Sequence, residues 1–273
     1  MAKRQTGWTE KKIARYFKEG HGQGELSNYK PWITIQDVPS RGRVHRETGW
    51  TTKRIHHLLS DLEYSYFCLL DWFDEVIDVR EQYPLNREKT MHIAEQVNIN
   101  HPMDPKTKTP IVMTTDFFIT VRKGNDISYL ARTIKPKKEL NDLRVIKKFE
   151  IERLYWEQEG IDWGIVTEDE LPEVLIDNIK WLRSSYSMSD SVDSEFIFLL
   201  VEELRIGTIP ILDLLKDFDM RYKLESGTAL FLFRHMLATK IIKMDMLVKI
   251  DLMLPVSSVT VVSDYRQEGR RAT

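Results

Sequence analysis

An aspartate and a lysine stand at the two open ends of a predicted β-hairpin in the segment TTDFFITVRKGNDISYLARTIKPKKEL, residues 114–140. A turn centred on the GN pair makes the numbers of directly opposed residues sum to 249, so Asp116 faces Thr133. Opposed side chains share a face, and alternate residues of a strand do too, which predicts Asp116, Thr133 and Lys135 on one side of the sheet. The opposite face carries apolar residues that suit a core: Phe117, Ile119, Val121, Leu130 and Ile134.

This pair of residue types can hydrolyse a phosphodiester. The carboxylate of Asp116 can bind Mg²⁺, and the ammonium of Lys135 can orient the attacking water or offset the charge that develops on the phosphoryl group. Because Mg²⁺ usually takes one or two protein carboxylates and fills its other positions with water and phosphate, a second acid is expected. The alternative interpretation is a surface salt bridge across an edge strand, and the spacing alone leaves both open.

Glu63 is the natural second acid, since it lies in the first turn of the helix that opens in HHLLSDLEYSYF. The same residue also completes a capping box with Ser60, in which the glutamate bonds back to the start of the helix. The spacing does not decide between these two roles. Glu150 and Glu152, on the long helix after Lys135, are further candidates, although glutamates on amphipathic helices are usually solvated.

Basic residues are concentrated at the start of the chain. Residues 1–58 contain 12 Lys and Arg against 5 Asp and Glu, although the whole chain has a net charge of only −2. This asymmetry indicates that the first segment faces a polyanion, or else that a solvated basic face is balanced elsewhere. The candidates for contact with DNA phosphates are Arg41, Arg43, Arg46 and His56.

The bulk properties exclude several classes of protein. A length of 273 residues suits two domains of ordinary size. The single cysteine, Cys68, excludes a disulfide or a thiolate zinc site within one chain. The first residues lack the apolar stretch of a signal peptide, and no run approaches the roughly 18 apolar residues of a membrane span. We therefore expect a cytoplasmic protein that does not enter a membrane.

The elements that must position these residues predict a mixed α/β domain. Helices are expected over residues 10–19, from Ser60 to about 76, over 86–97 and over about 140–160, where Gly160 ends the last one. The helix from Ser60 is expected to bury five apolar side chains: Leu62, Tyr66, Leu69, Leu70 and Phe73. Strands are expected in VIDVREQYPL, in the hairpin and in DWGIV, which gives a mixed sheet with helices packed on it.

From about residue 169 the pattern changes to helices separated by short breaks. The last two, IPILDLLKDFDMRY and ESGTALFLFRHMLATK, form a predicted helix-turn-helix pair. The segment IIKMDMLVKIDLML after them alternates like a short β-ribbon, so that the whole resembles a winged helix. We therefore expect one domain over residues 1–168 and a second, helical and winged-helix-like domain over residues 169–273.

Several longer motifs add a resemblance to a known family. The segments YKPWITIQDVPSRGRVHR, HHLLSDLE, REQYPL, TDF, IKP, ERLYW and NIKWL occur in the order and spacing of TnsA proteins. These are the endonuclease subunits of heteromeric cut-and-paste DNA transposases. The resemblance covers roughly residues 5–185 well and the remainder by its helix pattern. It implies a restriction-endonuclease-like fold for the first domain.

The resemblance also implies a catalytic set, mapped by motif. Glu63 in SDLE, Asp116 in TDF and Lys135 in IKP match the family's helix glutamate, strand aspartate and strand lysine. The main-chain carbonyl of the residue before the lysine, here Ile134, is a further metal ligand in that family. Glu152 in ERLYW matches an additional acidic position.

One position departs from the family pattern. The family usually has glutamine two residues before the lysine, whereas this chain has Thr133. Its shorter hydroxyl makes Thr133 a candidate metal ligand only through a bridging water.

The function implied by the resemblance is cleavage of the 5′ strands at the ends of a mobile element, with Mg²⁺ as cofactor and Mn²⁺ as a substitute. The implied partners are the transposon-end DNA, a TnsB-like recombinase that cuts the 3′ strands, and a TnsC-like AAA+ regulator that contacts the C-terminal domain. The implied location is the bacterial cytoplasm, on the nucleoid during activity. Two alternatives stay open: a stand-alone restriction or repair nuclease, and a non-catalytic winged-helix DNA-binding adaptor.

Overall fold

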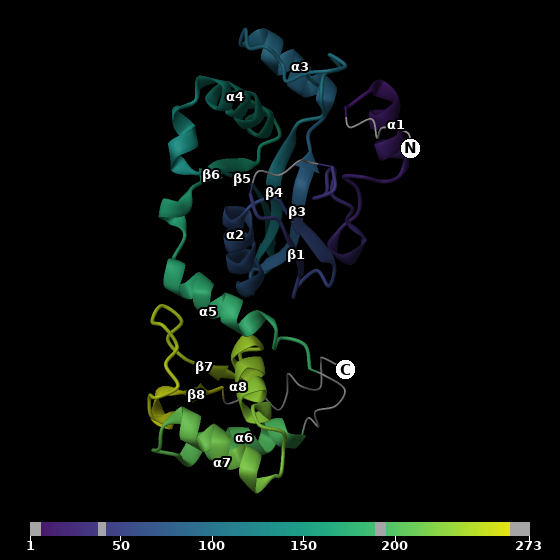
Figure 1. The fold of residues 1–273 in the computed structure, drawn as a ribbon. Helices are drawn as coiled ribbons and strands as arrows, with labels where there is room; N and C mark the ends of the chain where they lie inside the picture. Colours follow the sequence, from purple (N-terminus) through teal and green to yellow (C-terminus); the bar gives the residue numbers. More distant parts are fainter. Residues whose placement is uncertain (1–6, 38–41, 189–194, 263–273) are drawn as a thin grey trace. The chain divides into compact units, whose positions relative to one another are not determined.

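The computed structural model describes residues 7–37, 42–188 and 195–262 (Figure 1). The chain divides into two compact units, residues 1–171 and residues 172–273. Across the described ranges, every helix is too short or too polar to span a lipid bilayer.

The first unit mixes helices and strands along the chain. Its helices are α1 (Glu10–Lys18), α2 (Asp61–Trp72), α3 (Arg87–Gln96) and α4 (Leu143–Gln158), with short 3₁₀ turns η1 (Leu26–Asn28), η2 (Lys137–Asn141) and η3 (Glu168–Glu170). Its strands are β1 (His45–Thr48), β2 (Ile55–Leu58), β3 (Val76–Pro84), β4 (Thr114–Lys123), β5 (Asp126–Ile134) and β6 (Asp162–Val166).

Local capping explains where the helices begin and end. The side chain of Thr9 accepts the Lys12 N–H at the start of α1, and Ser60 accepts the Glu63 N–H at the start of α2. The prediction that Phe73 is buried is wrong. Helix α2 ends at Trp72, and Phe73 follows with extended backbone and a 44% exposed side chain.

The main sheet has the order β3-β4-β5-β6. Strands β3, β4 and β5 are antiparallel, whereas β6 runs parallel to β5, which makes the sheet mixed as predicted. Phe117 pairs with Arg132 and Lys123 with Asp126, so the predicted hairpin register is confirmed. A two-residue turn closes the hairpin, with Gly124 in the left-handed conformation at φ +61°.

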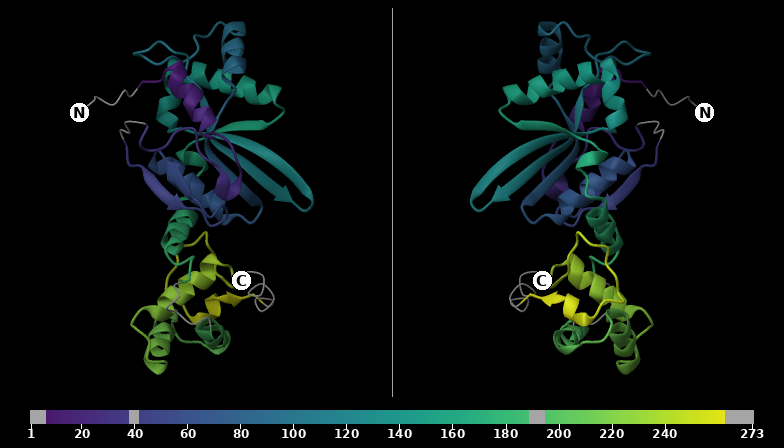
Figure 2. Two further views of the ribbon diagram at one scale, coloured as in Figure 1. Left: turned by 90° about the vertical axis from the view of Figure 1, so that its right-hand side faces the viewer. Right: turned by 90° about the vertical axis from the view of Figure 1, so that its left-hand side faces the viewer.

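Helices cover both faces of this sheet. Helix α2 packs Phe67 and Leu70 against the face that carries Phe117, Ile119 and the other apolar hairpin residues named above, as the alternation predicts. Helices α3 and α4 cover the other face, where Phe118 and Ala131 meet Ile151 and Trp156. In Figure 2 the tip of the β4–β5 hairpin projects away from the helices, while its open end lies close to α4.

The second unit is helical. It contains α5 (Glu173–Arg183), α6 (Glu195–Ile206), α7 (Ile211–Arg221), α8 (Thr228–Ala238), β7 (Ile242–Lys243), η4 (Val256–Ser258) and β8 (Thr260–Val261). Strands β7 and β8, which follow α8 in the chain, pair antiparallel.

The predicted β-ribbon within residues 241–254 is wrong in its extent. Only Ile242 and Lys243 of that stretch are in a strand, and their partners lie later, at Thr260 and Val261. The segment between them is instead held by the amide of Asn178, which donates to the carbonyls of Met246 and Val248. Alternation of apolar residues there reflects a folded loop and not a ladder.

Candidate active site

Asp116 lies partly buried at the open end of the hairpin. Its Oδ2 accepts the main-chain N–H of Ile134 at 2.8 Å, and its Oδ1 accepts the side-chain amide of Gln82 at 3.2 Å. The carboxyl is therefore fixed to the end of β5 from one side and to β3 from the other. Burial raises the pKa of Asp116, although these hydrogen bonds and two nearby lysines oppose the rise.

The alternation of side chains between the two faces of β4 is broken at this residue. Thr115 faces α4, because its hydroxyl donates to Glu152 Oε1 and accepts from Trp156 Nε1, both at 2.7 Å. Phe117 packs on the opposite side, under α2. In a regular strand residues 115 and 117 would share a face, so the strict alternation used for the prediction does not hold at Asp116. The opposed residue Gln82 has φ +49°, a second departure from regular strand geometry at the same level.

Glu63 bonds back to the start of α2, although it does not complete the predicted capping box, because its carboxyl accepts the Leu59 N–H in place of the Ser60 N–H. Its Oε2 accepts the Leu59 N–H at 2.9 Å, and its Oε1 accepts the Ser60 hydroxyl at 3.1 Å. Burial raises the pKa of Glu63 to about 8, and the negative charge of Asp116 adds to the effect. The positive charge of Lys135 opposes it. Capping and membership of an acid cluster are therefore compatible at this residue.

Lys135 follows β5 and stands near both acids. Its charge lowers the pKa of Glu63 and of Asp116, while its ammonium lies 2.8 Å from Glu139 Oε2. The alternative of an Asp116–Lys135 salt bridge on an edge strand is wrong. Asp116 is on β4, an interior strand of the sheet, and is partly buried, while the ion pair of Lys135 is with Glu139.

Glu152 is the third acid at this end of the sheet. It is fully buried, and its Oε1 accepts hydrogen bonds from Thr115, Thr133 and Trp163. Its Oε2 has no partner among the described residues, and burial raises its pKa. By contrast, Glu150 pairs with Arg153 at 2.9 Å on the outer face of α4, so it does not belong to the cluster.

The donor set suits a hard divalent cation. No group of three His, Cys, Asp or Glu side chains arranged for a metal occurs within the described part of the chain. Two carboxyls are sufficient for Mg²⁺, because water and phosphate oxygens complete its six positions. The charge of the partly buried Asp116 disfavours ionisation of the buried Glu63, and a cation between the two carboxyls would remove that conflict.

The candidates for DNA contact have different outcomes. Arg46 is exposed on β1, and Arg43 is exposed just before that strand. Arg41 lies outside the described residues. The prediction for His56 is wrong, because its ring is fully buried. It lies 2.8 Å from Glu81 Oε2 and 2.7 Å from the Thr52 hydroxyl.

Sequence reasoning missed the network to which His56 belongs. Glu81 on β3 is fully buried and accepts both arms of the Arg54 guanidinium, at 2.8 and 2.5 Å, in addition to His56. These hydrogen bonds and positive charges hold the pKa of Glu81 well below its ordinary value. The available signal was the run of charged residues in the middle of the strand VIDVREQYP. The network ties β2 to β3 next to Gln82.

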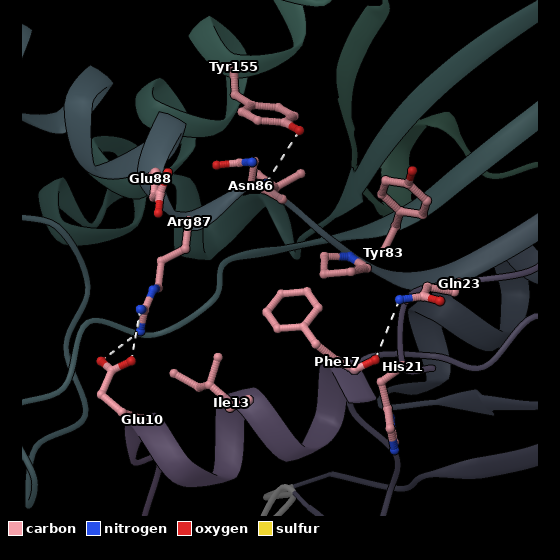
Figure 3. A pocket seen from close by; sticks show the side chains of 14 residues that line it. Glu10, Ile13, Phe17, His21, Gln23, Tyr83, Asn86, Arg87, Glu88 and Tyr155 are labelled. Atoms are coloured by element: carbon pink, nitrogen blue, oxygen red, sulfur yellow. Dashed lines mark hydrogen bonds and ion pairs between the residues drawn. The ribbon is translucent and has the colours of Figure 1, made fainter. Parts of the chain in front are cut away.

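A cavity of about 580 Å³ lies elsewhere, between α1, the end of β3 and the start of α3 (Figure 3). Ile13 and Phe17 point into it from α1, and Glu10 pairs with Arg87 at 2.8 Å across one side. Among the described residues, its lining has no acid whose pKa is raised by a neighbouring carboxyl; Glu10 is instead paired with Arg87. The open end of the β4–β5 hairpin is therefore the better candidate for chemistry.

A mixed sheet with an aspartate and a lysine at the open end of a hairpin, and a buried glutamate on the helix beside it, is typical of one class, the nucleases of restriction-endonuclease-like fold. Comparison with known proteins identifies the family. The family described as "TnsA-like endonuclease N terminal" matches residues 73–168, and "TnsA endonuclease C terminal" matches residues 170–246. "Transposon Tn7 transposition protein TnsA" of Escherichia coli is 40% identical over 247 residues, which cover 89% of each chain. The chain belongs to the TnsA endonuclease family.

Proposed function

We propose that this endonuclease is the Mg²⁺-dependent subunit that cleaves the 5′ strands at the ends of a mobile element during cut-and-paste transposition. The observation that carries the proposal is that the charges of Asp116 and Lys135 both act on the buried carboxyl of Glu63, in a chain 40% identical to a transposition protein. Mn²⁺ would substitute for Mg²⁺, because both take oxygen ligands in octahedral geometry.

Glu63, Asp116 and the main-chain carbonyl of Ile134 would hold the ion. When bound, the ion supplies an activated water and neutralises charge on the phosphate. The hydrogen bond from the Ile134 N–H to Asp116 fixes the position of one carboxylate relative to the end of β5. Lys135 follows directly, so the same bond sets where its ammonium can orient the water or offset charge in the transition state.

Thr133 and Glu152 act behind this set in the proposal. The Thr133 hydroxyl donates to Glu152 Oε1, which leaves its oxygen lone pairs free, and its contact with the ion would run through a bridging water. We assign Glu152 to joining the ends of β4 and β5, because it binds Thr115 on one strand and Thr133 on the other. This keeps the two strand ends that carry Asp116 and Lys135 in register.

The two domains would have different roles. We assign residues 1–168 to cleavage, with Arg43 and Arg46 placed to contact DNA phosphates. Residues 169–273 are assigned to contact with a TnsC-like AAA+ regulator, while a TnsB-like recombinase recognises the transposon ends and cuts the 3′ strands. The protein would act in the bacterial cytoplasm, on the nucleoid. Helix α8 buries most of its apolar residues, which suits packing better than base reading.

The test is strand-resolved mapping of breaks in a reaction reconstituted from the full chain, its recombinase, its AAA+ regulator and a donor DNA with both element ends. Asp116→Ala should abolish 5′-strand breaks and leave 3′-strand breaks in place. A matched control is Asp126→Ala at the start of β5, which lies at the other end of that strand from the site. Persistence of 5′-strand breaks with Asp116→Ala would overturn the assignment.

A further inference from the structure

A second lysine lies beside the acid cluster. Lys148 is on α4, four residues before Glu152, so the two side chains project from the same face of the helix. Glu152 is anchored at the strand ends through Thr115 and Thr133. Lys148 is half-buried, so its alkyl stem is partly covered while its ammonium can stay near water at the edge of the cluster.

The charge of Lys148 acts on two of the three acids of the cluster, Glu152 and Asp116. It is the largest influence that lowers the pKa of Glu152 against the effect of burial. It also lowers the pKa of Asp116, more strongly than Lys135 does. A single charge that acts on both carboxyls must lie close to both, because Coulomb interactions weaken with distance.

The hydrogen-bonding capacity of Lys148 is unused. Its ammonium makes no hydrogen bond or ion pair within the ranges that the structure describes, whereas the ammonium of Lys135 is bonded to Glu139. An ammonium carries three donors, and those of Lys148 are not committed to a protein acceptor, so they are open to an acceptor that arrives with the DNA. A DNA phosphate brought to Glu63 and Asp116 would supply the missing acceptor.

We propose that Lys148 is a second cation of the active site, which binds a non-bridging oxygen of the DNA phosphate that is cleaved. This inference rests on the proposed function of Glu63 and Asp116. The non-bridging phosphoryl oxygens gain charge as the attacking oxygen adds to phosphorus, and a preorganised ammonium stabilises that charge. Lys135 then serves the attacking water, and Lys148 serves the phosphate.

The experiment compares Lys148→Ala, Lys148→Met and Lys148→Arg in the reconstituted reaction of the full chain. Lys147→Ala is the matched control, because Lys147 is the neighbouring, exposed lysine of α4. Loss of one preorganised donor to a charged transition state should lower the rate of 5′-strand cutting at saturating DNA about 100-fold. Lys148→Arg should stay within about 10-fold of the native rate, and Lys147→Ala within about twofold.

Lys148→Met separates phosphate binding from packing. Methionine keeps an unbranched apolar stem without the charge, so it should be as defective in cutting as Lys148→Ala. DNA binding by both variants should also depend less on salt, with a slope smaller by about 0.9 for one lost phosphate contact. Native rates in Lys148→Ala, or recovery of cutting in Lys148→Met, would overturn the proposal.

Asp116→Ala in the same reaction distinguishes two kinds of failure. If Asp116→Ala is inactive while Lys148→Ala cuts normally, only the role of Lys148 is refuted. If Asp116→Ala still cuts the 5′ strand, the proposed site fails, and the inference about Lys148 fails with it.

Discussion

Proton release from Glu63 should accompany metal binding. Burial and the charge of Asp116 raise the pKa of Glu63 to about 8, from an ordinary value of 4.5. At neutral pH the metal-free carboxyl is therefore mostly protonated, and a cation must displace that proton. Metal affinity should rise with pH up to about 8 and level off above it.

The magnitude follows from proton competition at one site. Below pH 8, each unit by which the pH falls should weaken the apparent metal affinity about 10-fold, or by about 1.4 kcal/mol. The stability of the metal-free protein should depend on pH in the opposite direction. Because the folded-state pKa of Glu63 is raised, its contribution to the free energy of unfolding is fully present below 4.5 and is lost as pH rises towards 8. The loss over that window is of the order of 4–5 kcal/mol.

Isothermal titration calorimetry with Mg²⁺ or Mn²⁺, in buffers of different ionisation enthalpy, measures the protons released. We expect about one proton for each ion at pH 6–7 and almost none at pH 9. Glu63→Gln should bind the ion weakly and without proton release. Glu150→Gln, a change on the outer face of α4, should behave as the native chain. Equal metal affinity at pH 6 and pH 8 would refute this reasoning.

Three further outcomes are expected. Glu81→Gln leaves the buried Arg54 guanidinium without its counter-charge, so urea unfolding should show a loss of about 3–5 kcal/mol; native stability would refute the network. Thr133→Val removes one donor to Glu152 and should cost about 1–3 kcal/mol and slow cutting, with no effect if the hydroxyl is idle. Arg46→Ala should weaken DNA binding and reduce its log–log salt slope by about 0.9, and an unchanged slope would exclude a phosphate contact.

The hairpin shows how far the sequence can be used to predict the fold. Alternation and the GN turn predict its register and its apolar face, because both depend only on local periodicity. The same rule fails at Asp116, where Thr115 turns towards α4 to reach Glu152. That departure depends on a residue 37 positions away, so no local pattern carries it.

The candidate site shows the same limit. The motifs identify Glu63, Asp116 and Lys135 as candidates, and in the structure the charges of Asp116 and Lys135 act on Glu63. The ion pair of Lys135 with Glu139 and the proximity of Lys148 to two acids depend on how α4 and η2 pack. Similarly, the sequence alone indicates an exposed His56, because fully buried charged residues such as Glu81 are rare.

Metal location is the decisive observation for this account. Crystals of the full chain soaked in Mn²⁺ should give an anomalous peak within about 2.3 Å of both the Glu63 and the Asp116 carboxylates. The peak should disappear in Asp116→Ala crystals. A peak at another place in the chain, or one that persists without the Asp116 carboxylate, would contradict the assignment of these two acids to the catalytic ion.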